Sequence, residues 1–208
     1  MQLFGPSAKE KMIDNLLNIK SNQLLFENLT ALQNEISVGF DTKVVAVTSV
    51  KSDSLTAAFA KGFADVFALN QSKTLIIDAN MYNPLLEKLL IESETDETKD
   101  VKIGNGYSLN KLSEGVFTIF LTKQVYPSAL FKSGFIQRIV NEQLGFFEHI
   151  VIITPSIKEH KEIVLLKDVV QSIILISQRN VTVKKHIYEA CAFLAEEKLP
   201  LAKTVVLK

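Results

Sequence analysis

The sequence has 208 residues, 47% of them hydrophobic, which suits one domain with a two- or three-layer core. Lysine and arginine together number 23, as do aspartate and glutamate, so net charge gives no basic field for nucleic acid or an anionic membrane. The single Cys191 cannot form an internal disulfide and no signal peptide opens the chain, which together favour a reducing cytosol. No apolar run approaches the roughly 20 residues that cross a bilayer, so we expect no direct membrane insertion and association only through a partner.

The first 40 residues predict two amphipathic helices, roughly 9–19 and 23–38, because leucine and isoleucine recur at near-helical spacing. Gly39 is a natural stop for the second helix. We expect segment 1–40 to pack on a single globular α/β domain formed by residues 41–208.

Beyond residue 40, short runs rich in valine and isoleucine alternate with helical patterns. Strands that are apolar on both faces and separated by helices are typical of a parallel sheet. We therefore predict an α/β fold with a three-layer, doubly wound, mostly parallel sheet, and a solvated acidic loop at 92–100. The predicted strands are 43–48, 74–78, 116–121, 149–153, 172–177 and 204–207, and the predicted helices are 55–69, 84–90, 129–144, a short one at 161–168, and 183–197.

The strand, polar turn and helix at 43–69 have the form in which nucleotide-binding α/β proteins keep a phosphate loop. Such a loop, G-x-x-x-x-G-K-[ST], brings backbone N–H groups, a lysine and a Mg²⁺-binding hydroxyl to the phosphates. Here Ser52-Asp53-Ser54-Leu55-Thr56-Ala57 has no glycine and no lysine after the turn. The helix N-terminus could still bind an anion, but we favour the interpretation that the Asp53 carboxylate caps the helix.

Four segments carry a family resemblance, and they are Thr48-Ser49-Val50-Lys51, Leu75-Ile-Ile-Asp-Ala-Asn-Met-Tyr-Asn-Pro84, Tyr126-Pro-Ser-Ala-Leu130 and His149-Ile-Val-Ile-Ile-Thr-Pro155. In these segments the chain resembles the bacterial tyrosine kinases, the cytoplasmic kinases of capsule and exopolysaccharide assembly. That family belongs to the MinD/ParA-like P-loop ATPases. The similarity covers about residues 24–208 and implies a P-loop NTPase-like fold.

The resemblance also implies which positions of the first motif would hold nucleotide. An ungapped alignment puts Thr56 at the phosphate-binding lysine and Ala57 at the Mg²⁺-binding hydroxyl. Asp53 and Leu55 take the glycine positions. The first motif is therefore degenerate at all four places.

The second and third motifs retain less chemistry than the family pattern implies. Asp78 survives as the first aspartate, which the family uses near Mg²⁺ and the acceptor hydroxyl. Asn80 stands at the second aspartate, Tyr82 at the arginine, and Thr154 at the aspartate of the third motif. Asp78 could be catalytic, but we favour a vestigial Asp78 that is hydrogen-bonded and caps the next turn.

These replacements predict that ATP and Mg²⁺ binding is lost or weak. Losing a lysine contact and a Mg²⁺ contact removes roughly 1.5–3 kcal/mol each, or about 10²–10⁴ in affinity. We expect no catalytic residue, and no metal site either, because the three histidines share no metal-ligand spacing. The resemblance then implies a catalytically inactive cytoplasmic scaffold or regulator in capsular or exopolysaccharide biosynthesis or export.

The expected partners are proteins rather than nucleic acid, namely a membrane chain-length regulator or an active kinase paralogue. A homo-oligomer is a further alternative, since the ring-assembly helix of the family falls on residues 24–30. Phe26 and Leu29 fit the family pattern there, but the paired charges do not. Two alternatives stand beside the scaffold. One is an atypical ATPase or tyrosine kinase that recruits nucleotide through Lys51, Lys61 and Asp78. The other is a degenerate MinD/ParA-like positioning protein.

Overall fold

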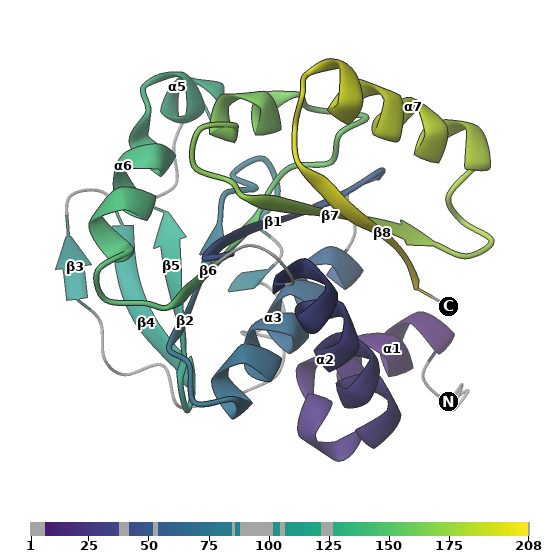
Figure 1. Ribbon diagram of the computed structural model, residues 1–208, viewed down its shortest axis with the longest axis horizontal. Helices are drawn as coiled ribbons and strands as arrows, with labels where there is room; N and C mark the ends of the chain where they lie inside the picture. Colours follow the sequence, from purple (N-terminus) through teal and green to yellow (C-terminus); the bar gives the residue numbers. More distant parts are fainter. Residues whose placement is uncertain are drawn as a thin grey trace, which may run out of the picture.

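A computed structural model describes residues 7–37, 42–51, 54–84, 86–87, 102–104, 107–121 and 127–207. Its centre is an eight-stranded sheet in the order β3-β4-β5-β2-β6-β1-β7-β8 (Figure 1). Neighbouring strands from β5 to β8 pair in parallel, whereas β3 and β4 add an antiparallel edge. The strands are β1 (Val44–Ser49), β2 (Thr74–Asp78), β3 (Lys102–Gly104), β4 (Tyr107–Ser113), β5 (Val116–Leu121), β6 (His149–Ile153), β7 (Ser172–Gln178) and β8 (Leu201–Leu207).

Helices cover both faces of this sheet (Figure 1). One face carries α1 (Ala8–Leu17), the 3₁₀ turn η1 (Ile19–Ser21), α2 (Gln23–Ser37) and α3 (Ser54–Leu69). The other carries α5 (Pro127–Lys132), α6 (Phe135–Gln143), the 3₁₀ turn η2 (Glu162–Leu166) and α7 (Lys184–Glu196). The predicted three-layer, doubly wound, mostly parallel α/β fold is confirmed. No helix among the described residues is long and apolar enough to span a membrane.

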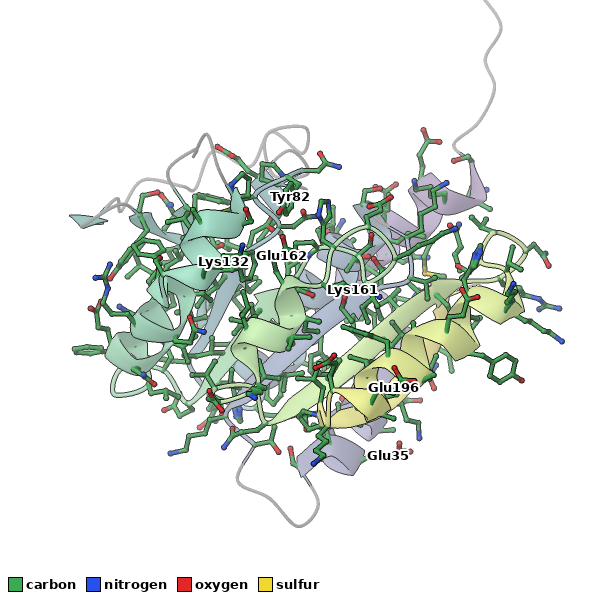
Figure 2. The ribbon with its side chains drawn as sticks, turned by 90° about the horizontal axis from the view of Figure 1, so that it is seen from above. Glu35, Tyr82, Lys132, Lys161, Glu162 and Glu196 are labelled. Atoms are coloured by element: carbon green, nitrogen blue, oxygen red, sulfur yellow. The ribbon has the colours of Figure 1, made fainter. Side chains whose placement is uncertain are left out.

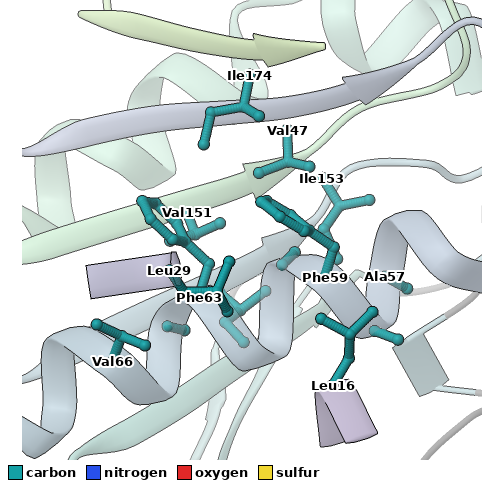
Figure 3. Close-up of a cluster of buried hydrophobic side chains, with 14 of the residues drawn as sticks. Leu16, Leu29, Val47, Ala57, Phe59, Phe63, Val66, Val151, Ile153 and Ile174 are labelled. Atoms are coloured by element: carbon teal, nitrogen blue, oxygen red, sulfur yellow. The ribbon is translucent and has the colours of Figure 1, made fainter. Parts of the chain in front are cut away.

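The two cores follow from the alternation of side chains along each strand. In β1, Val45 and Val47 point into the core under α3, whereas Val44 and Ala46 point into the core on the opposite face. A central strand therefore has to be apolar at every position, which is why its sequence reads as a continuous valine-rich run. Figure 3 shows Val47, Val151, Ile153 and Ile174 from neighbouring strands facing the aromatic side of α3.

Helix α3 is enclosed on all sides, since 12 of its 16 residues are buried and most of these are apolar. Its strand-facing side stacks aromatic rings, with centroid distances of 5.9 Å between Phe59 and Phe63 and 5.0 Å between Phe63 and Phe67. Its other side is covered by α1 and α2. The N-terminal helices thus shield the side of α3 that the sheet leaves uncovered.

A buried ion pair fixes the end of α1 to α3. The Lys61 ammonium donates to the Leu17 carbonyl at 2.9 Å and to Asp65 Oδ2 at 2.6 Å. Ser113 donates to the other Asp65 oxygen at 3.2 Å. Burial raises the pKa of Asp65, and the nearby charge and hydrogen bond of Lys61 oppose that rise.

The structure departs from the predicted elements at two places. The helix expected over 129–144 is two helices, because Gly134 adopts a left-handed φ of 72° and starts α6 in a new direction. Strands β3 and β4 were not predicted, since β4 contains Asn110, Lys111 and two serines and is only half-buried. The predicted stop at Gly39 and the acidic segment 92–100 lie outside the described residues.

Candidate functional site

The carboxyl ends of the parallel strands meet at one edge of the sheet, where α/β folds of this kind bind ligands. Strands β2, β6, β1 and β7 are neighbours there, so Asp78 at the end of β2, Thr154 after β6 and the first turn of α3 after β1 share this edge. The structure thus brings most of the predicted site residues together. Asp53 lies outside the described residues, so its predicted capping role stays a prediction.

Asp78 is 3% exposed and both its carboxylate oxygens accept backbone hydrogen bonds. Oδ1 accepts from the Asn80 amide and Oδ2 from the Leu86 amide, each at 3.0 Å. This is the arrangement of an aspartate that organises the turn after its strand. The carboxylate therefore has a structural task in this chain.

Asn80 and Thr154 are also buried at this edge. The Asn80 side chain is 3% exposed, and its Oδ1 accepts from the Asn83 amide at 3.4 Å. Thr154 is 1% exposed, its amide donates to Val47 at 3.0 Å, and its hydroxyl donates to the Pro155 carbonyl at 3.3 Å. Both side chains stabilise loops that follow strands.

The first turn of α3 presents no charge to this edge. Leu55 and Thr56 are each 2% exposed, and Ala57 is fully buried. The Thr56 hydroxyl is buried and makes no hydrogen bond with any residue that the structure describes. A buried hydroxyl without a partner costs about 1–3 kcal/mol, so Thr56 is a local weak point of the fold.

A small cavity lies beside Thr56, between α3, β7 and the end of β8. Its volume is about 20 Å³, enough for one water molecule. Sites for small molecules usually measure about 300–1,000 Å³. The cavity is lined by Ser49, Lys51, Leu55, Thr56, Ile176, Ser177, Gln178, Val181, Thr182 and Leu207.

A second cluster gathers near the end of β2, and the sequence analysis found only one of its members. Tyr82 donates a hydrogen bond to Glu162 Oε1, and the two side chains lie together in Figure 2. The Tyr82 ring stacks on His160 with centroids 3.6 Å apart, and His160 Nδ1 lies 4.0 Å from Glu162 Oε2. Burial first, and then Glu162, raise the pKa of Tyr82 to about 12.

This cluster holds the Tyr82 phenol in its protonated form at neutral pH. A phenol that needs strong base to ionise is a hydrogen-bond donor, not a nucleophile. Tyr82 stands where the resemblance implies an arginine, which was the only sequence signal for the cluster. Its partners His160 and Glu162 are about 80 residues away and follow no motif.

Two further predicted groups lie elsewhere. Lys61 is held by Leu17 and Asp65 beneath α1, so it is not a member of this site. The segment 24–30 lies on α2 and lines a groove of about 680 Å³ between α1, α2 and β8, with Leu24 69% exposed. Lys203 of β8 and Glu35 of α2 form an ion pair at this groove.

Comparison with known proteins connects the chain to one group of bacterial enzymes. No protein-family model matches the sequence. The candidate tyrosine-protein kinase CapB of Staphylococcus aureus is 27% identical over 202 residues, which cover 90% of this chain and 80% of CapB. The kinase domain of the Escherichia coli tyrosine kinase ETK has the same fold, with a TM-score of 0.77, 14% identity, and 99% and 83% of the two chains covered. The MinD cell division protein of Aquifex aeolicus gives a TM-score of 0.54 at 16% identity, covering 80% of this chain and 70% of MinD.

Proposed function

We propose that this chain, which resembles the bacterial tyrosine kinases and has their MinD/ParA-like fold, is a catalytically inactive member of that group. In this proposal it is a cytoplasmic scaffold or regulator in capsular or exopolysaccharide biosynthesis or export. The observation that carries the proposal is the first turn of α3. A buried threonine and a buried alanine stand where phosphate transfer needs a lysine and a Mg²⁺-binding hydroxyl.

The remaining residues of this edge support the same proposal, because they do not fit a triphosphate and a divalent ion. Asp78 already receives two backbone N–H groups, and Asn80 and Thr154 bring no charge. Phosphoryl transfer depends on positioning and charge neutralisation. The cavity beside Thr56 has room for only one water molecule. These residues therefore offer little positioning and little charge neutralisation to a triphosphate.

We propose that the chain acts by binding other proteins, and that its partner is a membrane chain-length regulator or an active kinase paralogue. The groove between α2 and β8 supports a homo-oligomer as well, because apolar side chains line it and Leu24 is largely exposed. The alternative of an atypical ATPase or kinase is weakened by the position of Lys61. The higher TM-score of the kinase domain than of MinD favours the kinase group over a positioning protein.

Calorimetry and thermal shift with millimolar Mg·ATP test the proposal. At 100 times its dissociation constant a ligand stabilises a protein by about 2.7 kcal/mol, which raises Tm by roughly 5–10 °C in a chain of this size. We expect no heat and no shift, with an active bacterial tyrosine kinase as positive control. A clear shift, or ATP and a divalent ion ordered over residues 52–57 in a crystal, would refute it.

A designed variant makes the negative result specific. Asp53→Gly, Leu55→Gly, Thr56→Lys and Ala57→Ser together restore the second half of the phosphate loop on the same scaffold, with G-K-S at residues 55–57 and a further glycine at position 53. We expect the folded quadruple variant, checked by circular dichroism, to bind Mg·ATP more tightly than the parent chain. Equal affinity in the two proteins would mean that these four positions do not explain the loss.

A further inference from the structure

The balanced net charge of the chain hides a local excess of basic residues at the connection from β7 to α7. Residues 178–188 contain Arg179, Lys184 and Lys185 and no acidic residue. Arg179 and Lys184 make no ion pair with any residue that the structure describes, and Lys185 has one exposed partner, Glu189, at 3.8 Å. This segment is therefore strongly cationic in a protein with no overall charge.

Two more cations border the same segment. Lys158 lies 3.2 Å from His186 on the first turn of α7. Lys51 lines the small cavity beside Thr56 together with Val181 and Thr182, and it is exposed. Glu159, which follows Lys158 in sequence, accepts a hydrogen bond from Ser156 at 2.7 Å.

Apolar side chains project from the middle of this basic region. Val181 is 55% exposed, Val183 is 57% exposed and Tyr188 is 74% exposed. Lys184 and Tyr188 are four residues apart on α7 and so share one face of the helix. Exposed valines and an aromatic ring among lysines are the composition of a surface that rests on lipid headgroups.

Hydrogen bonds fix the backbone of the connection before any partner binds. The Thr182 hydroxyl accepts from the Gln178 amide at 2.9 Å, and the Arg179 amide donates to the Leu207 carbonyl at 2.8 Å. Asn180 takes the left-handed conformation, with φ of 62°, that closes the turn. Presenting the valines on a fixed turn lowers the entropy cost of burying them.

We propose that the surface formed by Lys51, Lys158, Arg179, Val181, Val183, Lys184, Lys185 and Tyr188 docks on an anionic lipid bilayer. We call these residues the β7–α7 patch. The connection lies at one extremity of the molecule, where a planar surface can reach it (Figure 1). An acidic peptide is the less suitable partner, because the cavity that the described residues form behind the patch holds only about 20 Å³. The inference does not rest on the loss of ATP binding.

Co-sedimentation of the full chain with vesicles tests this proposal. We expect binding to vesicles of phosphatidylcholine with about 30% phosphatidylglycerol, which have a negative surface potential, and none to pure phosphatidylcholine. Each basic residue near an anionic surface contributes about a fivefold increase in partitioning. The triple variant Arg179→Gln, Lys184→Gln and Lys185→Gln should therefore partition about 100-fold more weakly.

Two further variants separate the patch from charge in general. Lys111→Gln, Lys132→Gln and Lys167→Gln remove the same net charge from exposed positions on β4, on α5 and after η2, and they should leave vesicle binding unchanged. Val181→Ser with Val183→Ser keeps every charge and should weaken binding roughly tenfold. Absence of binding to anionic vesicles would overturn the proposal. So would equal loss in the two triple variants, or patch-dependent capture of an acidic protein without vesicle binding.

Discussion

Gly62 of α3 lies directly beneath the Leu16 carbonyl of α1, so close that a Cβ at position 62 would stand 2.6 Å from the Leu16 oxygen. That contact is with backbone, which cannot rotate away as a side chain would. Gly62→Ala should therefore push α1 off α3 and lower the free energy of unfolding by about 1–3 kcal/mol. Urea denaturation followed by circular dichroism measures the change.

Gly145→Ala is the matched control for that substitution. A Cβ at Gly145 meets no atom within 4 Å, and Gly145 is not at positive φ. The free energy of unfolding of Gly145→Ala should equal that of the parent chain or exceed it by about 0.4–1 kcal/mol, because alanine restricts the unfolded chain. Equal losses at the two glycines would show that the close approach of α1 is not what Gly62 provides.

Replacing each of two buried threonines at this edge of the sheet by valine should change the stability of the fold in opposite directions. Thr56 has a buried hydroxyl without a described partner, so Thr56→Val should stabilise the fold by about 1 kcal/mol. Thr48 donates to the Pro155 carbonyl at 3.1 Å, so Thr48→Val should destabilise it by about 1 kcal/mol. The denaturation midpoint of each variant, compared with that of the parent chain, measures the two effects. A destabilised Thr56→Val would mean that a water in the adjacent cavity satisfies the hydroxyl.

The Lys61–Asp65 pair predicts strong coupling between its members. Lys61→Met should cost about 3 kcal/mol or more, because it leaves a carboxylate that is 6% exposed without its ammonium partner. Replacing both, as Lys61→Met with Asp65→Leu, should cost less than the single change. A double-mutant cycle measures the coupling.

The pH dependence gives the Lys61→Met variant a second signature. Burial already raises the pKa of Asp65, and removing Lys61 takes away the interaction that opposes this rise. A carboxyl whose folded pKa is raised stabilises the fold below its unfolded pKa and loses that effect as pH rises through the folded value. The deficit of Lys61→Met relative to the double variant should therefore be smaller near pH 4 than at pH 7.

Tyr82 should ionise as a distinct step in an alkaline absorbance titration. Its folded pKa of about 12 exceeds the ordinary value of 10.0, so its contribution to stability is complete below pH 10 and is lost as pH rises toward 12. Tyr82→Phe should remove the step near pH 12. Glu162→Gln should move it to lower pH, because the hydrogen bond and the charge of Glu162 both raise the pKa of Tyr82. A titration in which Tyr82→Phe leaves the late step in place would contradict the assignment.

The sequence was a good guide to the fold wherever burial was uniform. The β1 run is buried at all six positions and α3 at most of its length, so local composition and tertiary environment agree. It failed where a single backbone conformation decides the path, as at Gly134, and on β4, whose polar residues lie on a half-buried edge of the sheet. Such choices are made by distant neighbours and leave little trace in a local pattern.

The candidate site was also predictable only in part. The positions of Thr56, Ala57 and Asp78 followed from motif spacing, because a strand and the turn after it are contiguous in sequence. The contact of Tyr82 with Glu162 could not be predicted, since it joins the turn after β2 to the start of η2, 80 residues away, and depends on how β2 and β6 pair. The missing partner of the Thr56 hydroxyl is likewise a property of packing.

The burial of α3 on all sides has a consequence for how the chain can be divided. A fragment that begins at β1 would expose the side of α3 that α1 and α2 cover, which is apolar apart from Lys61 and Asp65. Such a fragment would bury that side against another molecule and precipitate or associate. The first two helices thus protect the protein from aggregation.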